Sequence, residues 1–159
     1  MIYFLATVLV AVTTYTDLKY RKIYNKTLVP VALAALVYYA VDGRFLESLL
    51  ALLFAFFVFF LVYVFGMTGA GDVKLFATWG ALSANTTVVG LAFLIYTFVH
   101  LTVSLVLLAR HVLKNKVSVI TVLKQDLLAF VTRSPGVVKF SFPGAVLINL
   151  VFVLAWFLV

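Results

Sequence analysis

Two aspartates stand out among the residues that could do chemistry in this chain, which has five acidic residues and no cysteine. Asp17 follows the first apolar stretch, and Asp72 precedes the fourth. When two carboxyl groups lie close together, they do not both ionise easily, so that one proton tends to be shared. The charged member can then take a proton from water while the protonated member donates to a carbonyl. Such a pair could hydrolyse a peptide bond.

The residues directly before Asp72 are small. Gly66, Gly69 and Gly71 lie within six residues, with Ala70 between the last two. Glycine permits backbone conformations that other residues avoid, and it allows another chain to approach closely. Non-helical backbone at membrane depth must be buried in protein or line a wet cavity, so we expect water to reach Asp72.

Simpler roles exist for both carboxylates. Asp72 could cap the helix that follows it, because its oxygens can accept from free backbone N–H groups. Asp17 could pair at the membrane interface with Lys19 or Arg21. A carboxylate within a membrane nevertheless costs about 2.5–3.5 kcal/mol at the centre and less near the edge, so such residues tend to mark functional sites.

The composition indicates an integral membrane protein, since 66% of the residues are hydrophobic and 11% are charged. The 159 residues suffice for one transmembrane domain, and we expect no separate soluble domain. The apolar N-terminal stretch has no basic residue before it, so we interpret it as a retained helix and not as a secretory signal.

Apolar stretches separated by polar or basic clusters predict an all-α bundle of about six transmembrane helices. The expected spans are Met1 to about Thr16, Thr27 to Val41, Phe45 to Phe65, Val73 to about Ala84, Thr87 to Leu108 and Pro143 to Val159.

The orientation follows from the basic residues, because short loops rich in Lys and Arg stay on the cytoplasmic side. One basic cluster follows the first span, and the other lies between the fifth and sixth spans. With six spans both clusters fall on one side, whereas without the fourth span they would contradict each other. We therefore place both termini outside, and Asp17 and Asp72 at the same cytoplasmic membrane face.

The long basic segment at about 109–142 includes an interrupted apolar run at 117–133. Lys124, Gln125 and Asp126 break this run before it could cross a bilayer. Two interpretations stay open with equal weight: an interfacial helix, or an irregular loop held to anionic lipids by its charge.

Two motifs resemble those of the type IV prepilin peptidases, which belong to the GxGD group of membrane aspartic proteases. The sequence "GAGD" at Gly69 to Asp72, followed by Val-Lys-Leu, is similar to the family pattern G-x-G-D-x-K. In that family the first catalytic Asp is followed, after five residues, by Ile-Pro-Asn, and here Asp17, Ile23 and Asn25 have this spacing.

The chain departs from the second motif at Tyr24, where the family usually has proline, which weakens the turn signal after the basic loop. The stretch "SFPGAVLINL" (141–150) also resembles the proline-containing entry to the family's last helix. Together these similarities cover the whole six-helix chain.

The resemblance implies a multi-pass protein of the cytoplasmic (inner) membrane that cleaves the leader from prepilins or prepilin-like proteins. Asp17 and Asp72 would be the catalytic pair, and Gly69 and Gly71 would shape the approach of the substrate. Lys74 would favour the ionised carboxylate or simply extend to the interface. Ile23 and Asn25 would support the site.

Only sixteen residues precede Asp17 and cysteine is absent, so the resemblance implies a short, peptidase-only form without a methylating segment. We expect no metal, no cofactor and no nucleic-acid partner; the expected partners are the prepilin substrate and anionic lipids. Two other classes remain open: a small ion or proton transporter, which should line a path through the midplane with carboxylates, and a non-catalytic scaffold of pilus assembly.

Overall fold

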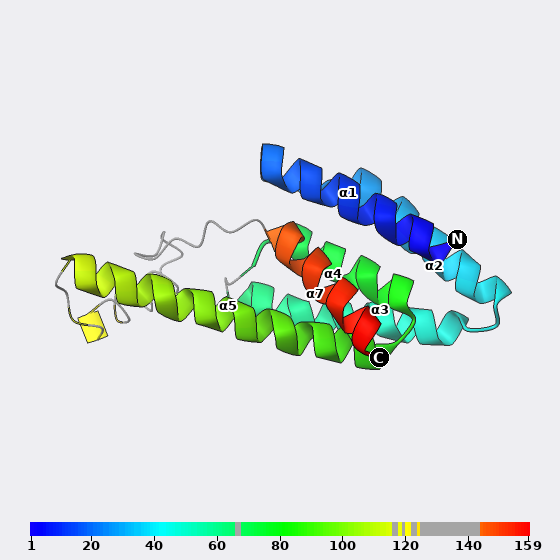
Figure 1. The fold of residues 1–159 in the computed structure, drawn as a ribbon. Coiled ribbons are helices and arrows are strands. Elements are labelled where there is room, and N and C mark those ends of the chain that lie inside the picture. The colour runs from blue at the N-terminus through cyan, green and yellow to red at the C-terminus, as the bar shows by residue number, and fades with distance from the viewer. Residues whose placement is uncertain (66–67, 116–117, 119, 122–123, 125–143) are drawn as a thin grey trace. The chain divides into compact units, whose positions relative to one another are not determined.

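All regular structure in the described part of the chain is helical, as the sequence predicts. The computed structural model describes residues 1–65, 68–115, 118, 120–121, 124 and 144–159. The helices of these residues are α1 (Ile2–Tyr20), α2 (Asn25–Val41), α3 (Phe45–Val64), α4 (Ala70–Ser83), α5 (Thr86–Asn115) and α7 (Gly144–Leu158) (Figure 1).

The chain divides into two compact units, and α5 begins in the first and continues into the second. The first unit comprises Met1–Tyr96 and Pro143–Val159, and the second comprises Thr97–Phe142. In the second unit, the described part of the basic segment lies mainly on the last residues of α5, which carry Arg110 and Lys114. The predicted interfacial helix at 117–133 falls almost entirely outside the described residues.

Two helices are longer than the hydropathy pattern predicts. The first was expected to end near Thr16, but α1 continues to Tyr20 and ends where Arg21 adopts a left-handed conformation (φ 52°). The fifth was expected to end at Leu108, but α5 continues to Asn115. In both cases the added residues include Lys or Arg, and cations are favourable near a helix C-terminus. Asp17 therefore lies within the last turns of α1.

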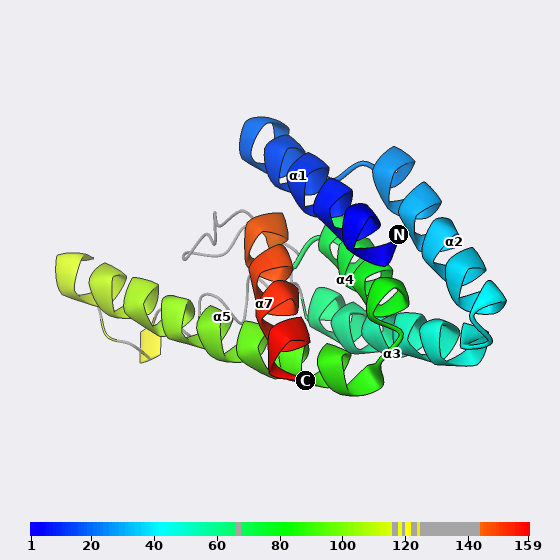
Figure 2. The same cartoon turned by 45° about the vertical axis from the view of Figure 1, so that its right-hand side comes forward.

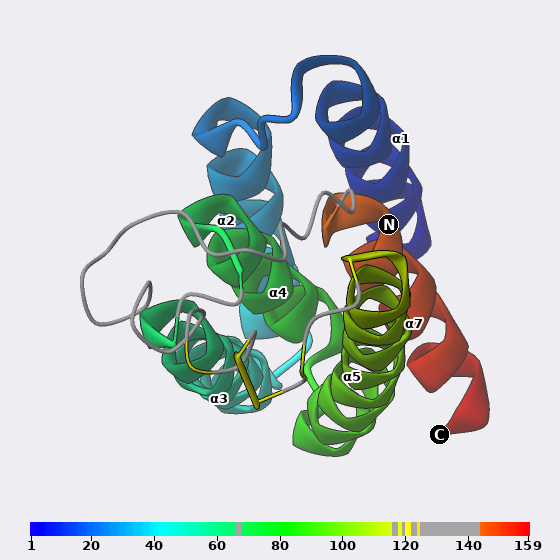
Figure 3. The same ribbon diagram turned by 90° about the vertical axis from the view of Figure 1, so that its left-hand side faces the viewer.

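Helix α4 is the central element of the first unit. Its residues from Leu75 to Ser83 are all buried, and it packs against α1, α2, α3 and α7 (Figure 3). The contact with α3 is close because Gly80 has no side chain: a Cβ there would lie 2.5 Å from the carbonyl oxygen of Ala51. Small residues allow such close approach of helices in membrane proteins.

The outward-facing side chains are those of a membrane protein. On α3 the buried positions include Ser48, Ala51 and Ala55, whereas Phe57 and Leu61 are about three-fifths exposed. Helices α1, α3 and α5 are long and apolar enough to cross a membrane, and α2 and α7 are shorter apolar helices. The prediction of six spans is not decided by these lengths.

Helices α1 and α7 run antiparallel in the first unit. At one end of the pair Tyr3 stacks on Trp156, with ring centroids 5.7 Å apart. Both chain termini therefore lie at this end (Figure 2). At the other end, the last turns of α1 meet the start of α7, and this is where the candidate site lies.

Candidate active site

Asp17 is buried at the end of α1, with 7% of its surface exposed. Its Oδ2 accepts a hydrogen bond of 2.9 Å from the backbone N–H of Ala145, which is 128 residues away. Ala145 lies in the first turn of α7, where backbone N–H groups have no partner within the helix. The carboxylate therefore satisfies a free amide and lies at the positive end of the helix dipole.

Asp72 lies in the first turn of α4 and caps that helix. Its Oδ2 accepts a hydrogen bond of 3.0 Å from the backbone N–H of Gly69, so the capping role considered from the sequence is present. The carboxylate also contacts the start of α7. A Cβ added to Gly144 would collide with Oδ1 of Asp72 and lie 2.9 Å from Oδ2.

The two carboxyl groups thus meet consecutive residues of one helix. Asp72 packs against Gly144, and Asp17 binds the N–H of Ala145. Carboxyl groups of α1 and α4 are therefore brought to one place by the first turn of α7.

The other residues of the two sequence motifs contact one another beside this pair. Gly71 packs closely against the side chain of Ile23, because a Cβ added to Gly71 would lie 3.2 Å from the Cβ of Ile23. The ammonium of Lys74 donates a hydrogen bond of 3.1 Å to Oδ1 of Asn25. These contacts attach the connection between α1 and α2 to the first turn of α4, so the two motifs form one local structure.

Tyr24 makes the turn without the proline that the resemblance leads one to expect. It is the N-cap of α2 with an extended backbone (φ −91°, ψ 129°), and its carbonyl accepts from the N–H of Thr27. The replacement of proline by Tyr24 therefore leaves the entry to α2 intact.

The remaining acidic residues whose structure is described lie elsewhere. Glu47 forms an exposed ion pair of 2.6 Å with Arg44 at the start of α3, and Asp42 is exposed after α2. Within the described ranges, no group of three His, Cys, Asp or Glu side chains is placed to hold a metal ion. Two carboxyl groups beside free backbone amides can provide general acid and general base chemistry at this site.

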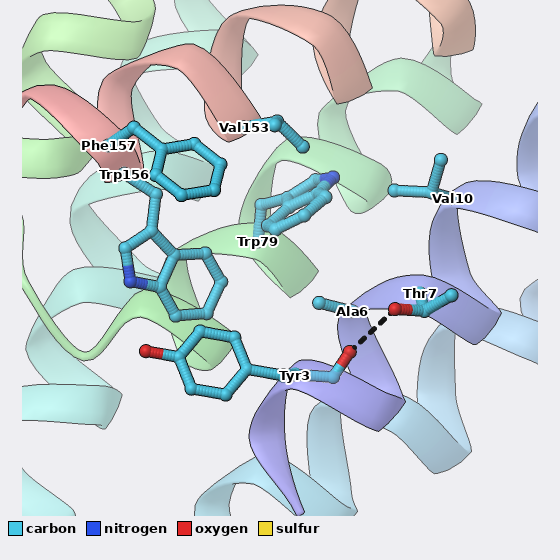
Figure 4. Close-up of a pocket in the computed structure, with 8 residues that line it drawn as sticks. All are labelled: Tyr3, Ala6, Thr7, Val10, Trp79, Val153, Trp156 and Phe157. Atoms are coloured by element: carbon cyan, nitrogen blue, oxygen red, sulfur yellow. Dashed lines mark hydrogen bonds between the residues drawn. The ribbon is translucent and has the colours of Figure 1, made fainter.

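An apolar groove lies further along α1, toward the chain termini (Figure 4). It has a volume of about 370 Å³ and is lined by Tyr3, Ala6, Thr7, Val10, Trp79, Val153, Trp156 and Phe157. Most of its lining consists of aromatic and aliphatic side chains.

Sequence reasoning missed the contribution of α7. Gly144 falls within the stretch at 141–150 that resembles the entry to the family's last helix, but its contact with Asp72 could not be predicted from spacing. Asn149 was also missed, although an amide side chain in an otherwise apolar helix is a signal in itself. Its carboxamide is buried and bonded to both α1 and α4.

Comparison with known proteins agrees with the motifs. The model of the type IV leader peptidase family matches residues 3–158. No curated protein matches the chain, and no solved structure matches it.

Proposed function

The chain belongs to the type IV leader peptidase family, and on this premise we propose that it is a membrane-embedded aspartic endopeptidase. In this proposal Asp17 and Asp72 are the catalytic pair. The enzyme removes the leader from type IV prepilins or prepilin-like proteins at the cytoplasmic membrane face. The observation that supports it best is the convergence of both carboxyl groups on Gly144 and Ala145.

The proposed reaction uses the two groups in opposite protonation states. The ionised carboxyl takes a proton from a water molecule as the water oxygen attacks the scissile carbonyl carbon, while the protonated carboxyl donates to the carbonyl oxygen. The carboxyl that took the water proton then gives it to the leaving nitrogen as the C–N bond of the tetrahedral intermediate breaks. The other carboxylate takes back a proton from one hydroxyl group of the intermediate, so that a carboxylic acid forms and the pair returns to its starting protonation states.

The proposed location of the carboxyl pair rests on the distribution of Lys and Arg along the sequence. Six spans with the basic clusters inside put both termini outside and the pair of carboxyls at the cytoplasmic face. The antiparallel arrangement of α1 and α7, with both termini at the end away from the carboxyls, is compatible with this topology. The basic residues would bind anionic lipids, because a prepilin leader is itself basic and would be repelled.

The small residues would admit the substrate. Gly69 and Gly71 precede Asp72 without side chains, and Gly69 is exposed. An extended peptide backbone can approach such residues closely. Lys74 would contribute indirectly, since its ammonium is bonded to Asn25 and not, among the described contacts, to a carboxylate.

The proposal is tested by incubating the purified protein in detergent with a candidate prepilin and sequencing the N-terminus of the product. Asp17→Asn and Asp72→Asn should each reduce cleavage by at least about 10²–10⁴-fold, the usual contribution of a general acid or base. Asp42→Asn is the matched control, because Asp42 is exposed and distant from the pair along the fold. Equal activity of all three variants would refute the assignment.

The same variants separate the alternatives. A transporter would lose ion flux in liposomes on loss of either aspartate, whereas a scaffold would retain its assembly function. In the described residues, α3 has no acidic side chain beyond its first turn and α5 has none. A carboxylate path through the midplane therefore finds no support in these helices.

A further inference from the structure

We propose that Asn149 is a positioning residue for the pair of aspartates: its buried carboxamide fixes α1, α4 and α7 in the register that brings Asp17 and Asp72 together. The inference rests on the proposed function for its catalytic consequence, but the geometric part can be tested without activity.

Asn149 bonds all three helices that build the site. It is buried, with 3% of its surface exposed. Its Oδ1 accepts a hydrogen bond of 2.8 Å from the indole Nε1 of Trp79 on α4. Its Nδ2 donates to the hydroxyl oxygens of Thr13 and Thr14 on α1, at 3.0 Å each. One side chain of α7 therefore holds both helices that carry the carboxyl groups.

The bonds of this side chain have fixed directions. An indole N–H can only donate, so Trp79 must face the amide oxygen. The hydroxyl of Thr13 donates to the carbonyl of Leu9 at 2.6 Å, so toward Asn149 it acts as an acceptor and must face the amide nitrogen. The site therefore requires a donor and an acceptor on one planar group, which a carboxamide supplies and an ionised aspartate or a leucine does not.

The position of Asn149 relates it to the aspartates. On α1, Thr13 precedes Asp17 by four residues, and on α7, Asn149 follows Ala145 by four. The bond from Asn149 to Thr13 and the bond from Ala145 to Asp17 are thus two parallel links between the helices, about 6 Å apart along their axes. Two hydrogen bonds at different positions along the helix axes oppose both translation and rotation of α7 relative to α1.

The third helix is fixed in the same way. Trp79 lies seven residues, or about two turns, beyond Asp72 on α4. Its bond to Asn149 and the packing of Asp72 on Gly144 again connect two helices at two heights. In lipid there is little hydrophobic drive between helices, so directional hydrogen bonds and close packing determine their register.

The kinetic test compares Asn149→Leu with a control at another buried bond. Ser48 is fully buried, and its hydroxyl donates to the carbonyl of Ala81 at 2.8 Å, which joins α3 to α4. Asn149→Leu should lower kcat for prepilin cleavage by about 10–100-fold, because a misplacement of about 1 Å can cost 10²-fold. KM should change little. Ser48→Ala should retain the kcat of the parent protein per folded molecule.

Variants at Thr13 test the same hydrogen bond if Asn149→Leu does not fold. Thr13→Val removes the acceptor and preserves the shape, and it should lower kcat, whereas Thr13→Ser retains the hydroxyl and should restore it. Normal kcat in both Asn149→Leu and Thr13→Val, or losses equal to that of Ser48→Ala, would overturn the inference.

A distance measurement makes the test independent of catalysis. The chain has no cysteine, so nitroxide labels can be attached at Leu18→Cys on α1 and Leu150→Cys on α7, which are both more than half exposed. Asn149→Leu should broaden or shift the distance distribution, and Ser48→Ala should leave it unchanged. An unaltered distribution in Asn149→Leu would refute the inference and leave the proposed function standing. If the parent protein cleaves no prepilin, yet Asn149→Leu shifts the distance distribution, the proposed function alone is refuted.

Discussion

Gly144→Ala is the substitution that most directly tests whether the start of α7 places Asp72. The new Cβ would lie 2.9 Å from Oδ2 of Asp72 and closer to Oδ1, whereas an unstrained contact is about 3.5 Å. The carboxyl group must therefore retreat by at least about 0.6 Å. Since about 1 Å of misplacement can cost 10²-fold in rate, we expect prepilin cleavage to fall by about 10–100-fold.

The fold should tolerate this change, because the atoms that must move are the end of a side chain. The thermal midpoint in detergent should therefore stay close to that of the parent. Gly90→Ala on α5 is the matched control, since a Cβ there would meet nothing within 4 Å. It should retain full cleavage. If Gly144→Ala cleaves as fast as Gly90→Ala, the contact between α7 and Asp72 has no role in catalysis.

Three further substitutions test the surroundings. Gly80→Ala would place a Cβ 2.5 Å from the backbone oxygen of Ala51, and the strain should lower the free energy of unfolding by about 1–3 kcal/mol in thermal denaturation; an unchanged midpoint would contradict the close packing of α3 on α4. Lys74→Met removes the exposed hydrogen bond to Asn25 and should lower the free energy of unfolding by no more than about 0.5–1.5 kcal/mol. Cleavage should persist in this variant, and loss of cleavage would instead give Lys74 a catalytic role. Tyr24→Pro should be neutral or stabilising by up to about 1 kcal/mol in the same denaturation assay, because φ is already −91°; marked destabilisation would show that the N–H of Tyr24 is needed.

Local features of the site were predictable from the sequence. The expected span from Val73 placed the start of this helix to within three residues, since α4 begins at Ala70. Ala70 and Gly71 are therefore helical, although the glycine-rich stretch was expected to be non-helical. The spacing of Asp17, Ile23 and Asn25 identified a second motif, whose members contact the first motif in the structure. Both results depend on short stretches of chain, where residue type and spacing constrain the backbone directly.

Long-range contacts were not predictable in this way. The bond between Asp17 and Ala145 joins residues 128 positions apart, and an apolar helix start gives no indication of which carboxylate it will meet. The end of α1 was also misplaced, because loss of hydropathy marks the edge of a membrane and not the end of a helix. The helix instead ends where Arg21 turns left-handed.

The cap formed by Asp72 has a consequence for the loop before it. A hydrogen bond to an ionised carboxylate is about twice as strong as one to a neutral acceptor, and Asp72 holds the N–H of Gly69 with the same group that exchanges protons in the proposed reaction. Each protonation would then loosen the first turn of α4, and each deprotonation would tighten it.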